Sequence, residues 1–234
     1  MNTILFDLDG TLVPITQEDF SRVYFGLLIQ KAKDMNIDTE SMKKGLFGGV
    51  NAMVNNDGSA LNENAFWQVF LSVTKADREA TEPIFRDFYA NEFKKVKSVM
   101  QPTEISKMLI KTLKDKGYRL ILATNPLFPI EAVVERMSWV GLTADDFEYI
   151  TTYENSSYCK PNPKYFADIL EKLNLKAEDC LMVGNNTVED MAAQKVGIKT
   201  FLVTDALENE KNIDISAFDN GSLKDFYKKA QDFQ

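Results

Sequence analysis

Residues 3–11 read TILFDLDGT, and the expected architecture starts from this stretch. Its apolar half, Thr3 to Phe6, ends abruptly at Asp7, which is typical of a buried strand that runs into a polar loop. If the chain stays extended, the side chains of Asp7 and Asp9 leave it on the same side. Such a pair of carboxylates either belongs to a polar turn that ends at Gly10 or binds a divalent cation. With a metal and a phosphate present, one carboxylate becomes a candidate nucleophile.

Beyond Pro102 the sequence alternates between strand-like and helical segments. Four further apolar runs predict strands over Arg119–Thr124, Tyr149–Thr151, Cys180–Gly184 and Lys199–Val203. This alternation predicts βα units that build a parallel sheet. Because the carboxyl ends of parallel strands meet at one edge, we expect ligands to gather at that edge.

Residues 17–99 follow a helical rhythm instead. Apolar side chains recur at spacings of three and four, as in Phe20, Val23, Tyr24, Leu27 and Leu28. Eleven of the 26 aromatic residues fall between Asp19 and Val99, so this region is expected to have a small core of its own. Gly48–Asn51 and Asn55 either face the functional site or mark a helix break, and the helix break with an exposed turn is favoured.

The amino-acid composition excludes several classes of catalytic site and binding partner. The 234 residues carry 27 Lys and Arg against 35 Asp and Glu, a formal charge of −8, which disfavours non-specific binding to nucleic acid or anionic lipid. The absence of histidine excludes Ser-His-Asp triads, imidazole bases and His-containing zinc sites. Carboxylates without histidine favour a hard, oxygen-ligated cation such as Mg²⁺. No apolar stretch approaches the roughly 20 residues of a membrane span, and the first residues do not resemble a secretory signal, so we expect a cytoplasmic protein.

Polar residues follow three of the other predicted strands. The hydroxyl of Thr124 and the backbone amide of Asn125 can donate to a phosphoryl oxygen, although a Thr at a strand end is usually only a turn residue. Lys160 precedes a Pro-Asn-Pro sequence that restricts its loop, so this lysine is either a solvated surface residue or a fixed cation. The loop Gly184–Asp190 reads GNNTVED, which either caps a helix or supplies metal ligands.

Taken in chain order, these four segments resemble the four motifs of the haloacid dehalogenase-like (HAD) superfamily. The first motif of its phosphatases, DxDGT, is matched in full by Asp7–Thr11. Thr124 matches the Thr or Ser of the second motif, and Lys160 with Pro161 matches the third. The fourth motif is matched only in part, because Asn185 stands where the superfamily usually has an Asp that ligates Mg²⁺.

The resemblance implies an α/β fold with two parts. Residues 1–16 and 100–234 would form a doubly wound, Rossmann-like parallel sheet core. Residues 17–99 would form an inserted, all-helical cap of the C1 type. Such a cap would close over the strand ends, exclude water and choose the leaving group.

The resemblance also implies roles in catalysis. Asp7 would attack a phosphomonoester, and Asp9 would protonate the leaving alkoxide and then help water to hydrolyse the aspartyl-phosphate. Relatives that cleave carbon–halogen bonds lack the second Asp, so Asp9 favours phosphate chemistry. Lys160 would neutralise the approaching phosphate as part of the catalytic set. The expected phosphate ligands are Lys160, Thr124, Asn125 and Gly10.

The cofactor implied in this way is Mg²⁺. Its expected ligands are the Asp7 carboxylate, the Asp9 backbone carbonyl, Asn185 and Asp190, with Glu189 as the alternative to Asp190. Because an Asn side chain adds no negative charge, we expect weaker metal binding than the usual Asp of the fourth motif would give.

These residues predict a Mg²⁺-dependent phosphomonoester hydrolase that acts on a small phosphorylated metabolite, such as a sugar phosphate, phosphoglycolate or a nucleoside monophosphate. The alternative is a HAD-fold protein without turnover that binds a phosphorylated ligand or a partner. Asn185 supports the alternative, whereas the intact Asp7, Asp9, Thr124 and Lys160 oppose it. Neither nucleic acid nor a membrane is expected as a partner.

Two other reactions of the superfamily fit less well. Sugar-phosphate mutases use a cap histidine, which this chain lacks. Phosphonatases need a cap lysine that forms a Schiff base, and nothing in the sequence marks a buried one among Lys31, Lys33, Lys43 and Lys44.

Overall fold

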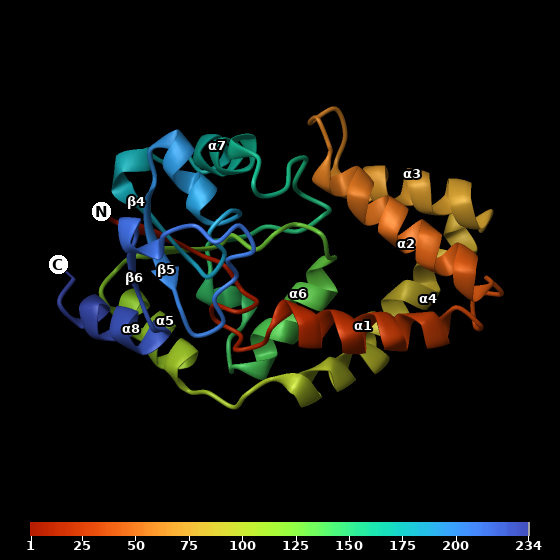
Figure 1. The fold of residues 1–234 in the computed structure, drawn as a ribbon, viewed down its shortest axis with the longest axis horizontal. Helices are drawn as coiled ribbons and strands as arrows, with labels where there is room; N and C mark the ends of the chain where they lie inside the picture. Colours follow the sequence, from red (N-terminus) through yellow and green to blue (C-terminus); the bar gives the residue numbers. More distant parts are fainter. Residues whose placement is uncertain (234) are drawn as a thin grey trace.

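A computed structural model describes residues 1–233, and a six-stranded sheet lies at its centre (Figure 1). The strand order is β3-β2-β1-β4-β5-β6, and every neighbouring pair is parallel, so the predicted α/β parallel sheet is confirmed. β1 pairs with β2 on one side and β4 on the other, so the loop after β1 lies in the middle of the sheet edge. The strands are β1 (Thr3–Phe6), β2 (Arg119–Leu122), β3 (Tyr149–Ile150), β4 (Cys180–Gly184), β5 (Lys199–Val203) and β6 (Asp219–Gly221).

Two differences from the expected strands have local reasons. β2 ends at Leu122, two residues before the predicted end, because the backbone carbonyl of Thr124 is bound by side-chain hydroxyls and not by a neighbouring strand. β6 was not expected at all, since its sequence Asp-Asn-Gly carries no apolar signal. It pairs with the edge of β5 over three residues.

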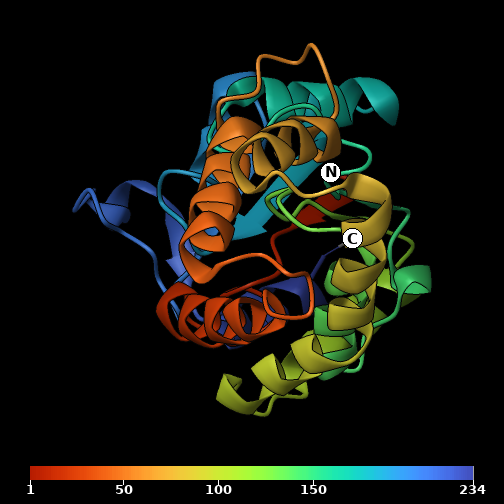
Figure 2. The same cartoon turned by 90° about the vertical axis from the view of Figure 1, so that its right-hand side faces the viewer.

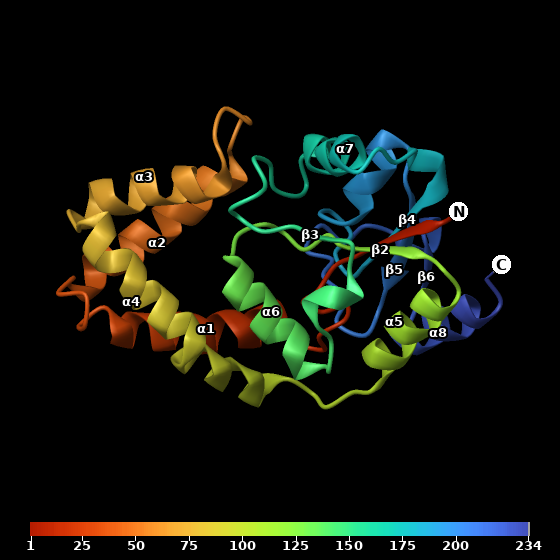
Figure 3. The same cartoon turned by 180° about the vertical axis from the view of Figure 1, so that it is seen from behind.

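Helices cover both faces of the sheet (Figures 1 and 3). The side chains of β1 alternate between two cores, with Ile4 and Phe6 in one and Leu5 in the other. The first core includes α5 and α8, and the second includes α7 and η4. The α-helices here are α5 (Ile105–Asp115), α6 (Ile130–Trp139), α7 (Pro163–Lys172) and α8 (Leu223–Gln231), and the 3₁₀ helices are η2 (Ala144–Asp146), η3 (Ala177–Asp179), η4 (Met191–Val196) and η5 (Ile215–Ala217).

Residues 17–99 form a helical layer beside the sheet, at the right of Figure 1 and towards the viewer in Figure 2. The rings of Phe66, Trp67, Phe70 and Phe85 contact one another there, with centroids 5.4 to 6.4 Å apart. They belong to a buried cluster that extends to the first core of the sheet, so the expected separate core is instead continuous with it. The helices are α1 (Gln17–Lys31), α2 (Thr39–Val54), α3 (Asn62–Thr74), α4 (Arg78–Ala90) and η1 (Glu92–Val99).

The expected helix break at Gly48–Asn51 is wrong, because α2 continues to Val54. Gly49 is buried against α3, where an added Cβ would overlap the ring of Phe66. One turn earlier, a Cβ on Gly45 would lie 2.8 Å from Cγ2 of Thr74. These glycines therefore allow close approach of two helices and do not interrupt one.

Within residues 1–233, no helix combines the length and the apolar character that crossing a bilayer requires.

We predict opposite effects of two glycine-to-alanine substitutions in this layer. Gly49→Ala should lower the free energy of unfolding by about 1–3 kcal/mol, because the added methyl group overpacks the contact with Phe66. Gly26→Ala, on α1, is the matched control, since its Cβ meets nothing within 4 Å. It should raise stability by roughly 0.5–1 kcal/mol through helix propensity. Urea denaturation measures both, and a neutral Gly49→Ala would contradict the close-approach explanation.

Candidate active site

The candidate site starts from a buried lysine at the carboxyl edge of the sheet. The Nζ atom of Lys160 lies 2.9 Å from Oδ1 of Asp7 and 2.7 Å from Oδ1 of Asp190. Burial alone would lower the pKa of Lys160, but the charges of Asp190 and Asp7 raise it, so the ammonium form persists. Burial also raises the pKa of the Asp7 carboxyl above its usual value, against the effect of Lys160.

The turn after β1 brings Asp7 next to Asn185. The hydroxyl of Thr11 donates to Oδ1 of Asn185 at 3.0 Å and lies 3.4 Å from Oδ2 of Asp7. Gly10 has a φ of +78°, and a Cβ there would overlap the Asn185 side chain. Only glycine therefore fits this position, both for its backbone conformation and for its contact.

Hydrogen bonds from several other segments fix the loop after β2. The carbonyl of Thr124 accepts hydrogen bonds from the hydroxyls of Thr151 at 2.7 Å and Tyr165 at 2.9 Å. Asn125 accepts the backbone N–H of Lys160 through Oδ1, and its Nδ2 donates to the Glu189 carboxylate at 2.9 Å. The second, third and fourth sequence segments are therefore directly connected.

The loop after β4 departs from the expected arrangement. The side-chain amide of Asn185 donates to the carbonyl of Ala206 at 2.7 Å, and that of Asn186 donates to Glu208 at 2.8 Å. Both amides thus tie this loop to the segment that follows β5, which carboxylates could not do as donors. Residues 187–190 form a turn and the helical backbone starts only at Met191, because the Asp190 side chain binds Lys160 and the Asn186 backbone N–H.

These side chains surround one cavity of about 240 Å³. It contains most of the residues that the sequence singled out, but Lys160 lies beneath the cavity and Gly10 does not line it. Burial raises the pKa of the Glu189 carboxyl to about 7. The polar lining from the loops after β1, β2 and β4 comprises Asp7, Asp9, Thr124, Asn125, Asn185, Asn186, Glu189 and Asp190.

The oxygen atoms in this cavity fit a hard cation only if Asn185 takes part. Oδ1 of Asp9 is buried and has no hydrogen-bond partner in the described chain. Oδ2 of Asp7 and Oδ1 of Asn185 converge on the same Thr11 hydroxyl. Residues 1–233 contain no group of three or more Asp, Glu, Cys or His side chains arranged to hold a metal, so the amide oxygen is needed to complete such a set.

Three charged residues that line this cavity were not expected from the sequence, namely Arg136, Glu208 and Glu210. Arg136, on α6, is buried and forms an ion pair with Oδ2 of Asp9, while its guanidinium stacks over Phe128 with 4.5 Å to the ring centroid. The sequence pattern that could have identified Arg136 is an arginine at a position of α6 where the helical spacing calls for an apolar residue. Glu208 arrives from the segment after β5, for which the sequence offered no signal.

The lysines considered for Schiff-base chemistry do not reach the cavity. Lys31 is buried, but its Nζ is held by Asp87 at 2.7 Å and Glu92 at 2.9 Å. Lys33, Lys43 and Lys44 are exposed.

Comparison with known proteins gives the family. Residues 1–209 match the model of the haloacid dehalogenase-like hydrolases. The chain belongs to this family. It is 24% identical over 210 residues to pyrophosphatase PpaX of Halalkalibacterium halodurans, covering 90% of this chain and 86% of the relative.

Solved structures of HAD proteins share the fold. The predicted phosphoglycolate phosphatase of Haemophilus somnus superposes with a TM-score of 0.61 at 20% identity, covering 99% of this chain and 98% of that one. The magnesium-bound HAD-hydrolase YfnB of Bacillus subtilis has a TM-score of 0.57 at 21% identity, with 99% of both chains covered. The resemblance inferred from the four motifs is thus confirmed.

We predict that Arg136 and Asp9 are energetically coupled. Arg136→Met should lower the free energy of unfolding by about 3 kcal/mol, because it leaves the Asp9 carboxylate without its cation. The double variant Asp9→Asn/Arg136→Met should lose less than the two single variants together. Urea denaturation of the four proteins tests this, and strictly additive losses would show that the pair has no mutual stabilisation.

Proposed function

We propose that this HAD-family hydrolase is a Mg²⁺-dependent phosphomonoester hydrolase that acts on a small phosphorylated metabolite through an aspartyl-phosphate. The observation that carries the proposal is the convergence of Asp7, Asp9 and Thr124 on one cavity, with Lys160 bound beneath Asp7. Relatives named for pyrophosphate and phosphoglycolate support phosphate as the group attacked.

The two oxygens of Asp7 are in different situations. Oδ1 is bound by Lys160 at 2.9 Å, whereas Oδ2 has only the 3.4 Å contact with Thr11. Oδ2 is therefore our choice for the atom that attacks phosphorus. Lys160 opposes the rise in the pKa of Asp7 that burial causes and holds the side chain in place, so it favours the ionised form that a nucleophile requires.

Asp9 is suited to proton transfer. Burial raises the pKa of its carboxyl above the usual value, although Arg136 opposes this shift. Its Oδ1 has no other partner among the described residues. We assign to Asp9 the proton that the leaving oxygen takes up, and afterwards the removal of a proton from the water that releases phosphate.

For Mg²⁺ we propose the Asp7 carboxylate, the Asp9 backbone carbonyl and the Asn185 amide oxygen. When bound, the cation supplies positive charge for the phosphoryl oxygens. Asp190, expected as a ligand from the resemblance, is better explained as the partner that positions Lys160, because both of its oxygens accept hydrogen bonds. Glu189 remains the acidic alternative, although Asn125 binds it.

The helical layer of residues 17–99 is our candidate for the C1-type cap, and residues 1–16 with 100–234 for the core. α1 starts at Gln17 and η1 ends at Val99, directly at the proposed boundaries. Phe20 of α1 lines the cavity around Asp7, so the layer contributes to the site.

We predict that the protein hydrolyses phosphomonoesters. Purified protein should hydrolyse p-nitrophenyl phosphate with Mg²⁺ and lose that activity with EDTA. Asp7→Asn should reduce turnover by about a thousandfold or more, since it removes the nucleophile. Silence with Mg²⁺ and Mn²⁺ on this ester and on a panel of phosphometabolites would overturn the proposed function.

A second prediction concerns Asn185. Asn185→Asp should lower the melting temperature without metal, because a carboxylate would face the Ala206 carbonyl in place of a donor. The same variant should gain a larger rise in melting temperature from Mg²⁺ than the parent protein, because it adds negative charge to the proposed ligand set. Equal Mg²⁺-induced rises in the two proteins would remove Asn185 from that set.

A further inference from the structure

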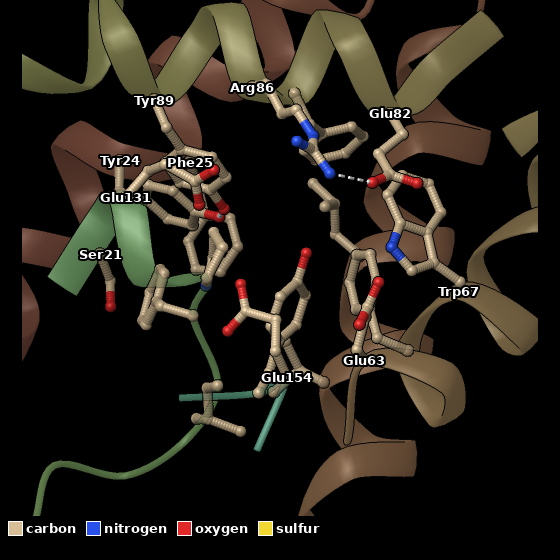
Figure 4. A pocket seen from close by; sticks show the side chains of 18 of the residues that line it. Ser21, Tyr24, Phe25, Glu63, Trp67, Glu82, Arg86, Tyr89, Glu131 and Glu154 are labelled. Carbon is tan, nitrogen blue, oxygen red and sulfur yellow. Dashed lines mark hydrogen bonds and ion pairs between the residues drawn. The ribbon is translucent and has the colours of Figure 1, made fainter. Parts of the chain in front are cut away.

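A second cavity lies next to the one around Asp7. It measures about 230 Å³ and lies between α1, α2, α3, α4, the start of α6 and the loops at residues 127–129 and 153–154 (Figure 4). The two cavities are neighbours, because Gln17, Phe20, Leu127 and Phe128 line both of them. A phosphate held at Asp7 would therefore direct the rest of its molecule towards this space.

Aromatic rings make up much of the wall. Their faces carry partial negative charge and attract cations, above all when water is excluded. Arg136 already lies over the rings of Phe20 and Phe128, and Arg78 over Trp67, whereas the other rings of this wall have no such contact among the described residues. The nine aromatic residues are Phe20, Tyr24, Phe25, Phe66, Trp67, Phe85, Tyr89, Phe128 and Tyr153.

Four carboxylates line the same space, and two of them have counter-charges. Glu63 is paired with Arg78, and Glu82 is paired with both Arg78 and Arg86. Glu131 and Glu154 form no ion pair within the described part of the chain, although Glu131 is exposed to solvent and Arg86 lines the same cavity. Figure 4 shows the Glu131 and Glu154 side chains around the same opening.

The two carboxylate oxygens of Glu154 have different surroundings. Its Oε1 accepts the backbone N–H of Ile130 at 3.1 Å, which accounts for one oxygen as a cap of α6. Its Oε2 is buried and has no partner in residues 1–233. Burial raises the pKa of this carboxyl, which is the effect of a charge left without compensation.

We propose that this cavity receives the leaving group of the substrate, and that this group carries a substituted ammonium ion beside an apolar body. The inference rests on the proposed phosphatase function and specifies its substrate class. Glu131 and Glu154 supply the charge that the ammonium needs, and the aromatic rings supply cation–π contacts.

Other leaving groups match the cavity less well. Pyrophosphate and phosphoglycolate, the compounds in the names of the relatives, release anions that the uncompensated carboxylates repel. A neutral polyol can donate hydrogen bonds to Glu154, but it leaves both negative charges without a counter-ion. The chemistry of the wall therefore favours a cation.

The test compares two esters that differ only in this charge. Phosphocholine carries a trimethylammonium group, and 3,3-dimethylbutyl phosphate replaces that nitrogen with carbon at the same size and shape. With Mg²⁺ present, kcat/KM should be higher for phosphocholine by about tenfold or more. Titration calorimetry on Asp7→Asn protein with both esters gives the same comparison without turnover.

Variants connect the preference to the two carboxylates. Glu154→Gln and Glu131→Gln should each lower the ratio of kcat/KM for phosphocholine to kcat/KM for the neutral ester by about threefold or more. Glu154→Gln retains an oxygen that can accept the Ile130 N–H. Glu18→Gln is the matched control, because it removes an exposed carboxylate of α1 that does not line the cavity.

The outcomes separate the two proposals. Equal kcat/KM values for the pair, or faster turnover of phosphoglycolate or glucose 6-phosphate than of phosphocholine, would overturn the ammonium proposal and leave the phosphatase intact. The same conclusion holds if p-nitrophenyl phosphate is hydrolysed and neither matched ester is. If no phosphate ester is hydrolysed, both proposals fail.

Discussion

The ammonium group of Lys160 is the charge that lets two carboxylates share the interior of this protein. Asp7 follows β1 and Asp190 follows β4, and these strands are neighbours in the sheet. Two carboxylates buried side by side would repel each other and lose their hydration, so neither loop could keep its position alone. Lys160, fully buried between them, replaces that hydration with two ion pairs at 2.9 and 2.7 Å. The geometry of the strand ends depends on this three-residue cluster.

The constraint extends outward through the backbone of Lys160. Its N–H donates to Asn125, whose side chain also binds Glu189, so the loops after β2 and β4 are fixed relative to the lysine. Tyr165, one turn into α7, holds the carbonyl of Thr124 with its hydroxyl. As a result, the polar groups around the cavity are positioned before any substrate arrives, which is the arrangement that electrostatic catalysis needs.

Sequence patterns predicted this edge well, because a strand and its turn are local features. The apolar run before Asp7 and the alternation of strands with helices were enough to place Thr124 and Lys160 near it. They could not show what distant segments supply. Arg136 lies in a helix whose apolar spacing gives no information on which carboxylate it faces, and Glu208 belongs to an irregular segment that is tied to the site by backbone and side-chain hydrogen bonds to residues 185–187. The ion pair between Asp190 and Lys160 could not be predicted either, because the two residues are 30 positions apart in the sequence.

The two neighbouring cavities differ in where their cations lie. Around the nucleophile, Lys160 binds Asp7 and Arg136 binds Asp9, while Glu189, Glu208 and Glu210 line that cavity without an ion pair among the described residues. In the second cavity Glu131 and Glu154 have no ion-pair partner among residues 1–233. A molecule with a phosphate at one end and an ammonium at the other can place its phosphate near Asp7 and its ammonium beside Glu154, whose Oε2 has no partner in that part of the chain. Binding energy gained far from phosphorus then helps to align the ester with Asp7, which lowers the entropic part of the barrier.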